Sequence, residues 1–360
     1  MTEISKTLIK GYYGRYPDYS YFIGASAGGL QAFSETQRYP EDYDGIIAGV
    51  PSNNALNLIV YFLWLQINLH EKDGSGIITK DQAKAISLCA AEFFGSRGDG
   101  EKGDDFVTYP YTDENTVNDF IEFLRGKSEL HLISRQLNIL RKIYNGPKNK
   151  KTGEQIFCGL PIGAERNSGY FGDASNGGKF GYPWLRLFFG EDYDDWTFDF
   201  ADDYDTILAE IGKDFTANNP ELDGLKANGS KFLVYSGSAD PAGPWADALK
   251  YCNRVCERLG GYEEVSKFYR FFILPGKAHG DTGLGVNKTW GDESRTSLLD
   301  TMRKWREKGT APEYLTGAHI DIEDGNERIK FIRRIYLYKA DKHECTEFPK
   351  TSSDSILERT

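Results

Sequence analysis

Strand-like and helix-like stretches alternate at two separate places along the chain. An apolar run that ends at Gly24 precedes a helical pattern up to Arg38, and residues 44–50 form a second run typical of a buried parallel strand. The alternation returns with apolar runs at residues 231–236 and 269–274. This pattern predicts an α/β fold with a mostly parallel sheet.

The stretch between these two places has a different pattern. Residues 55–229 combine polar helices, glycine-rich loops and scattered aromatic residues, which we interpret as a large inserted lid domain over the carboxyl edge of the sheet. Residues 1–54 and 230–310 are then the two parts of the core. Residues 311–360 are predicted to be an irregular tail that packs on the core and contains one strand-like stretch, residues 329–338. A chain of 360 residues is long enough for two domains.

A glycine-rich turn joins the first strand to the helix after it. Its sequence, Gly24-Ala25-Ser26-Ala27-Gly28, has the form G-x-S-x-G, and its small residues allow the sharp turn that holds a serine hydroxyl out at the sheet edge. The backbone N–H of Ala27 would lie at a helix N-terminus, where it can donate to an oxyanion. A purely structural turn with a surface serine has the same sequence form, so the motif alone does not identify a nucleophile.

Two further residues follow the ends of predicted strands. Asp240 comes after the strand at residues 231–236, and His279 comes after the strand at residues 269–274. The order serine, aspartate, histidine is that of α/β-hydrolases. His279 would accept the proton of Ser26, and Asp240 would orient the imidazole. The alternative for Asp240, which precedes a proline, is a purely structural turn.

Composition narrows the range of partners and compartments. The net charge of -11 argues against nucleic acid or an anionic membrane as a partner, since either needs a basic face. No apolar run reaches membrane-spanning length. The five cysteines have neither CxxC nor zinc-binding spacing. The chain does not begin with a segment of signal-peptide type, so its compartment stays open.

Three stretches are similar to the tannase and feruloyl esterase family: Gly24–Asn54, Lys231–Pro241 and Phe271–His279. Weaker similarity extends through the inserted stretch, so that the resemblance covers most of the chain. It implies an α/β-hydrolase core, an inserted lid, secretion, and hydrolysis of phenolic-acid esters, with a small-molecule phenolic ester or a plant cell-wall ester as substrate. The positions that match the family's triad are Ser26, Asp240 and His279.

The chain departs from the family pattern in two ways. Family members carry a cysteine before the serine and another after the histidine, joined as a disulfide, whereas Ala25 and Gly280 occupy these places here. Packing alone is then expected to hold His279 near Ser26. The strands that precede the serine strand in such hydrolases are also absent, so the core is interpreted as N-terminally truncated. In such hydrolases a loop among these strands gives the second oxyanion donor. The N–H of Ala27 is then the one donor that remains, which predicts impaired activity.

The family lid often binds calcium through an acidic, glycine-rich loop. The nearest counterpart is Gly98–Phe106, whose possible ligands are Asp99, Asp104 and Asp105. Calcium at this loop would be structural, and catalysis itself is predicted to need no cofactor. A solvated acidic turn is the alternative.

The sequence thus predicts a serine carboxylesterase of the feruloyl esterase or tannase type that works through an acyl-enzyme. One alternative is a catalytically impaired remnant that binds an aromatic or glycoside ligand through the lid. Another is a peptidase or acyltransferase on the same core. A phenolic ring would be received by aromatic residues of the lid, among which the sequence does not separate pocket from core: Tyr61, Trp64, Tyr170, Phe171 and Trp184.

Overall fold

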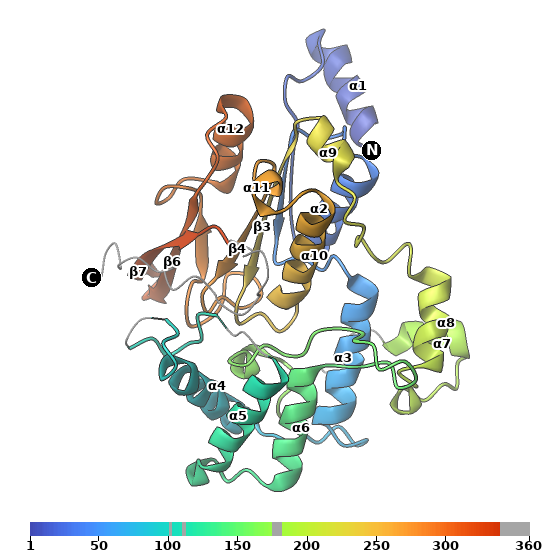
Figure 1. Cartoon of the computed structure of the whole chain (residues 1–360), viewed down its shortest axis with the longest axis vertical. Helices are drawn as coiled ribbons and strands as arrows, with labels where there is room; N and C mark the ends of the chain where they lie inside the picture. Colours follow the sequence, from blue (N-terminus) through green and yellow to red (C-terminus); the bar gives the residue numbers. More distant parts are fainter. Residues whose placement is uncertain (101–102, 110–112, 175–181, 339–360) are drawn as a thin grey trace.

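The computed structural model describes residues 1–100, 103–109, 113–174 and 182–338 (Figure 1). Its centre is a four-stranded parallel sheet with the spatial order β1-β2-β3-β4, so β1 lies at one edge. The strands are β1 (Tyr21–Ala25), β2 (Gly45–Gly49), β3 (Lys231–Gly237) and β4 (Tyr269–Leu274). All four strands run the same way, so their carboxyl ends meet at one edge of the sheet.

Both faces of this sheet are covered, as a parallel sheet requires. One face packs on α2 (Ala27–Arg38), α9 (Asp223–Ala227), α10 (Trp245–Arg258) and α11 (Tyr262–Val265). The other face packs on α12 (Leu298–Lys308), whose Met302 and Trp305 contact the cluster around Ile47 of β2. Every residue of β2 is buried, which explains its unbroken apolar sequence.

The C-terminal part of the described chain is more regular than the sequence analysis predicts. Strands β5 (Lys288–Trp290), β6 (Tyr314–Glu323) and β7 (Asn326–Tyr336) form an antiparallel sheet. The prediction of an irregular tail is therefore wrong for residues 314–323, whereas the strand-like stretch predicted at residues 329–338 is confirmed by β7. Two small residues, Gly317 and Ala318, occupy the buried part of β6 and hide its apolar alternation. The turn between β6 and β7 is Asp324-Gly325, and both residues have positive φ, as a type I′ hairpin turn requires.

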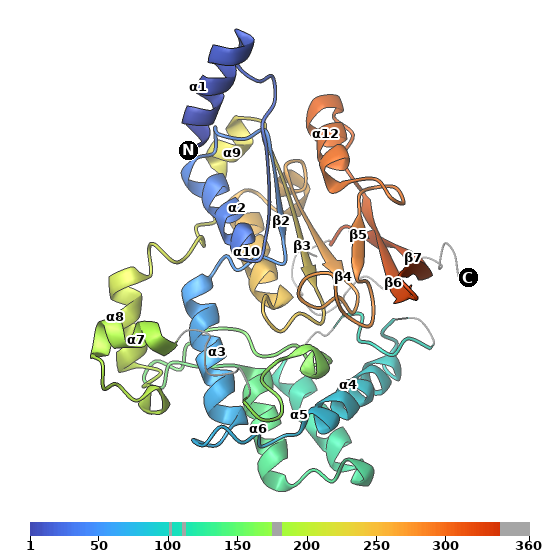
Figure 2. The same cartoon turned by 180° about the vertical axis from the view of Figure 1, so that it is seen from behind.

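A helical segment lies across the carboxyl ends of the parallel strands (Figures 1 and 2). Its helices are α3 (Ala55–Leu69), α4 (Lys80–Gly95), α5 (Glu114–Arg125), α6 (Ser134–Asn145), α7 (Tyr182–Phe189) and α8 (Asp202–Ile211). These helices share a hydrophobic core that is distinct from the clusters on the sheet. Helix α3 contributes buried residues along its whole length, which fits its apolar sequence. None of the described helices is long and apolar enough to cross a membrane.

The N-terminal segment is the least packed part of the described chain. Helix α1 (Thr2–Tyr13) buries none of its residues, and it stands at the end of the molecule away from the helical segment (Figure 1). Strand β1 pairs with β2 alone, and Ile23 at its centre is 54% exposed. The strand that carries the serine therefore has one bare edge among the described residues.

Candidate active site

Ser26 occupies a strained turn between β1 and α2. Its backbone has φ 57° and ψ -118°, a conformation that costs about 1–3 kcal/mol for a residue other than glycine. Two glycines make the turn possible. A Cβ at Gly24 would lie 2.1 Å from the carbonyl oxygen of Gly28, and a Cβ at Gly29 would lie 2.7 Å from Cα of Pro51. Close backbone approach therefore requires glycine at position 24 of the G-x-S-x-G motif and at position 29 just after it, whereas a Cβ at Gly28 would meet nothing within 4 Å.

Hydrogen bonds hold the backbone of this turn in place. The N–H of Ser26 donates to the carbonyl of Gly49 on β2 at 3.0 Å, and its own carbonyl accepts from the N–H of Gly29 at 2.8 Å. Ala27 begins α2, so its N–H lies at the positive end of the helix dipole. No acceptor for that N–H is present in the part of the chain that the structure describes. This donor is free for a ligand.

Asp240 follows β3 and is completely buried. Its Oδ1 accepts from the N–H groups of Ala242 at 2.8 Å and Gly243 at 2.9 Å. Its Oδ2 lies 2.9 Å from Nδ1 of His279. Both carboxylate oxygens therefore have partners, which offsets the cost of burying a charge and fixes the plane of the carboxylate.

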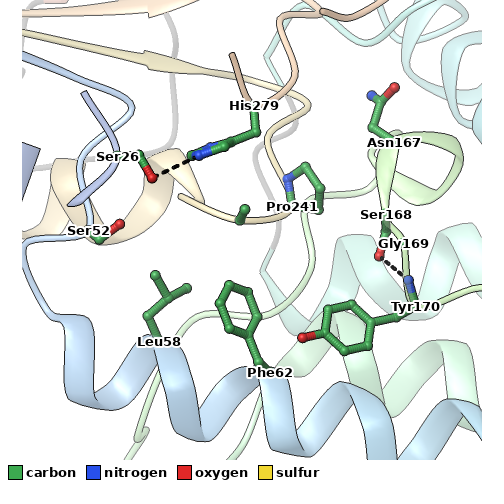
Figure 3. A pocket seen from close by; sticks show the side chains of 11 residues that line it. Ser26, Ser52, Leu58, Phe62, Asn167, Ser168, Gly169, Tyr170, Pro241 and His279 are labelled. Carbon is green, nitrogen blue, oxygen red and sulfur yellow. Dashed lines mark hydrogen bonds between the residues drawn. The ribbon is translucent and has the colours of Figure 1, made fainter. Parts of the chain in front are cut away.

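His279 connects the other two residues. It lies in the loop after β4, and its Nε2 is 2.9 Å from Oγ of Ser26 (Figure 3). The hydrogen bond with Asp240 raises the pKa of His279 above its ordinary value, while burial and the neighbouring Lys277 oppose this rise. Because the carboxylate accepts from Nδ1, the neutral ring presents an unprotonated Nε2 to the serine. The three residues predicted from the sequence thus lie in one hydrogen-bonded relay.

The loop that carries His279 is held by polar contacts as well as packing, so the expectation that packing alone would hold it is wrong. Lys277 is 2% exposed, and its Nζ donates to the carbonyl of Gly280 at 2.5 Å. The carbonyl of Lys277 accepts from the N–H of Ala239, beside Asp240, at 3.0 Å. The N–H of Ala278 donates to the carbonyl of Thr282 at 2.9 Å. These bonds tie the loop to itself and to the end of β3.

A cavity of about 420 Å³ opens beside Ser26 and His279. It is lined by Ser26, Ser52, Leu58, Phe62, Asn167, Ser168, Gly169, Tyr170, Pro241, Ala242 and His279 (Figure 3). Leu58 and Phe62 lie one helical turn apart on α3, and this i, i+4 spacing could have identified them in a helix expected to cover the site. Neither of these residues, nor Ser52, is among the site residues predicted from the sequence.

The aromatic residues proposed to receive a phenolic ring divide into two groups. Tyr170 lines the cavity. Tyr61 and Phe171 are buried in the core of the helical segment, and Trp64 and Trp184 pack against that core. Tertiary packing, which the sequence does not reveal, makes this division.

Two of the three carboxylates suggested as calcium ligands have hydrogen-bond or ion-pair partners within the protein. Asp104 pairs with the buried guanidinium of Arg333, whose Nη1 lies 2.8 Å from Oδ2. Asp99 accepts from the N–H groups of Thr108 at 2.7 Å and Tyr109 at 2.9 Å. The described residues, which do not include residues 101–102 of this loop, contain no group of three or more acidic, histidine or cysteine residues able to hold a metal. Calcium binding at this loop stays a prediction.

A strained serine, a histidine and a buried aspartate, each beyond the carboxyl end of a parallel strand, are the arrangement of the α/β-hydrolases. Two solved structures share this fold. Feruloyl esterase B from Aspergillus oryzae aligns with a TM-score of 0.77 and 21% identity, over 94% of this chain and 68% of that one. Tannin acyl hydrolase from Aspergillus niger aligns with a TM-score of 0.71 and 18% identity, over 94% of this chain and 65% of that one.

The sequence comparisons define the family. The model described as "Tannase and feruloyl esterase" matches residues 1–177 and 187–343, so the chain belongs to this family. A probable feruloyl esterase from Arthroderma benhamiae is 30% identical over 347 residues, which cover 89% of this chain and 60% of the relative. A probable feruloyl esterase B from Aspergillus niger is 27% identical, over 98% of this chain and 68% of the relative. The chain thus spans roughly two thirds of the length of these relatives.

Proposed function

We propose that this protein is a serine carboxylesterase that hydrolyses esters of phenolic acids, of the feruloyl esterase or tannase type. Its substrate would be a small-molecule phenolic ester or a plant cell-wall ester. The observation that carries the proposal is the relay from Ser26 through His279 to Asp240, which opens on an apolar cavity. Family membership supports the same reaction class.

Acylation would begin with attack by Oγ of Ser26 on the ester carbonyl. As the O–C bond forms, Nε2 of His279 takes the serine proton, and Asp240 stabilises the resulting imidazolium. The carbonyl oxygen becomes an oxyanion, to which the N–H of Ala27 donates. The tetrahedral intermediate then collapses: the bond to the alcohol oxygen breaks, and His279 gives its proton to that oxygen. The alcohol leaves, and the acid remains as an ester of Ser26.

Deacylation would repeat these steps with water as the nucleophile. His279 removes a proton from the water as it attacks the acyl carbon, and Ala27 again donates to the oxyanion. When the intermediate collapses, the bond to Oγ breaks and His279 returns its proton to Ser26. The free acid is released, and no metal or cofactor takes part in either half of this scheme.

The arrangement of the chain supports the proposed division of labour. We propose residues 1–54 and 230–310 as the catalytic core and residues 55–229 as the lid that selects the acyl group. Residues 311–338 of the predicted tail pack on the core, and residues 339–360 lie outside the described residues. Contacts from α3 and from residues 167–170 to the cavity support a lid role, because these segments face Ser26 and His279 across it (Figure 3). The volume of the cavity lies within the range of small-molecule binding sites.

The proposal is tested with a fluorophosphonate probe and with methyl ferulate. We expect covalent labelling of Ser26 and turnover of the ester, both lost in Ser26→Ala. The control is Ser266→Ala, at a half-buried serine before β4, which should retain labelling and turnover. A folded protein that neither reacts with the probe nor hydrolyses methyl ferulate, methyl gallate or simpler acetyl esters would refute the esterase proposal.

A second candidate is a binding module without turnover, acting on an aromatic or glycoside ligand. The exposure of Ala25 and Ala27 on either side of Ser26 favours it, because a solvated oxyanion donor is weaker than one shielded from water. The same experiment separates the candidates. Methyl ferulate that binds equally to the wild type and to Ser26→Ala, without hydrolysis, would support the binding module.

A further inference from the structure

The hydroxyl of Tyr170 is an anomaly within the candidate site. Its Oη is buried and has no hydrogen-bond partner among the residues that the structure describes. The Tyr170 ring lines the cavity and stacks on Phe62, with the ring centroids 5.8 Å apart and the planes 26° apart. A buried hydroxyl without a partner destabilises the free protein, so its retention in a ligand cavity suggests a partner that arrives with the ligand.

The surroundings of Tyr170 define what that partner can be. Leu58 and Phe62 contribute only hydrocarbon to this wall of the cavity, so an aromatic ring can lie against them. Burial raises the pKa of Tyr170 well above its ordinary value, which keeps the phenol neutral. A neutral phenol can both donate and accept, and a neutral hydroxyl on the ligand can do the same. A charged group here would lose its hydration without an opposite charge to replace it.

The position of Tyr170 also matches the shape of an aromatic acyl group. Ser26 and His279 stand on one side of the cavity, while Phe62 and Tyr170 stand on the opposite side (Figure 3). An acyl group whose carbonyl lies at Ser26 would extend its ring toward Phe62. A hydroxyl on the far side of that ring is then the group closest to Tyr170.

We propose that Tyr170 is a specificity-determining residue whose hydroxyl bonds to a phenolic hydroxyl on the acyl ring of the substrate. This inference rests on the proposed function and deepens it, because it selects esters of hydroxylated aromatic acids over esters of unsubstituted ones. Binding also requires a small shift of the Phe62 and Tyr170 side chains, since the Tyr170 hydroxyl is closed to solvent in the free protein.

The test compares two esters that differ by one hydroxyl, methyl 4-hydroxycinnamate and methyl cinnamate. Dissociation constants are measured in the Ser26→Ala background, where neither ester is consumed. We expect the hydroxylated ester to bind about tenfold tighter, and Tyr170→Phe to reduce this ratio to about one. The matched control is Tyr61→Phe. It removes another buried hydroxyl without a described partner, but from a side chain outside the cavity lining, and should leave the ratio unchanged.

The melting temperature of the ligand-free protein provides a second readout. Tyr170→Phe removes an unpaired buried hydroxyl, so we expect a melting temperature equal to or above that of the parent. A binding ratio that survives Tyr170→Phe, or that falls equally in Tyr61→Phe, would overturn the inference. Absence of binding by both esters would also overturn it. If the protein with an intact Ser26 binds the two esters in the expected ratio but hydrolyses neither, the proposed esterase function is refuted and the inference about Tyr170 is not.

Discussion

The two sides of the Ser26–His279 hydrogen bond have very different structural support. Ser26 follows β1, an edge strand with an exposed centre, and is flanked by two exposed alanines. His279 and Asp240 follow β4 and β3, where Asp240 is completely buried and both of its carboxylate oxygens accept hydrogen bonds. Asp240 is therefore part of the protein core and His279 is half-buried beside it, whereas the turn that carries Ser26 lies close to the surface.

This difference shows that the Ser26 turn can be held in place by contacts on the β2 side of β1 alone. The turn at Ser26 takes its position from β2, through the bond to Gly49 and the close contact of Gly29 with Pro51. Since β2 pairs with β3, the position of the serine depends on the same buried strands that carry Asp240. The bare edge of β1 takes no part in these contacts.

The largest effect is expected on the buried side, from Asp240→Asn. The amide would keep an acceptor for the backbone N–H groups but would no longer stabilise the imidazolium or favour the correct tautomer of His279. We expect kcat to fall by about 10⁴-fold with little change in fold. Ester hydrolysis and circular dichroism measure the two quantities. Asp281→Asn, at a nearby exposed carboxylate, is the control and should stay within a few-fold of the wild type. An equal loss in both variants would contradict the relay.

Alanine substitutions at Ile23 on β1 and at Ile47 on β2, which are paired in register, test how much each strand contributes to the free energy of unfolding. Ile23 is 54% exposed and Ile47 is 1% exposed. Ile47→Ala should lower the free energy of unfolding by about 2–5 kcal/mol, because it leaves a cavity between the sheet and α12. Ile23→Ala should cost about 0.5–1 kcal/mol or less. Urea unfolding measures both, and similar losses would mean that the edge of β1 is covered in solution.

The smallest effect is expected in the pH dependence. His279 must be neutral to accept the serine proton, and the hydrogen bond with Asp240 raises its pKa above 6.5. We therefore expect kcat/KM to rise with pH, with a midpoint above 6.5 that moves to lower pH in Asp240→Asn. The raised pKa also stabilises the folded state at low pH, and this contribution is lost as the pH rises through the folded-state pKa. A midpoint that Asp240→Asn leaves unchanged would show that the carboxylate does not tune His279.

Much of the candidate site can be predicted from the sequence because its elements are local. Residues 24–28 combine the small residues that a sharp turn needs with a serine at its centre, and Asp240 and His279 each follow an apolar run. Parallel strands bring their carboxyl ends together, so residues far apart in sequence meet without further information. The Asp324-Gly325 turn is a similar local signal, and the hairpin it joins could have been predicted from it.

Other features depend on contacts between distant segments. The sequence alone determined the turn at Ser26, the order of the strands along the chain and the chemistry of the three residues, because backbone sterics and hydrophobic periodicity act over a few neighbouring positions. The tertiary contacts decide that Asp104 pairs with Arg333, and that Tyr170 lines the cavity while Tyr61 is buried in the core of the helical segment. The physical reason is that burial and pairing depend on which surfaces meet, and aromatic or acidic side chains with the same local pattern can end in either place.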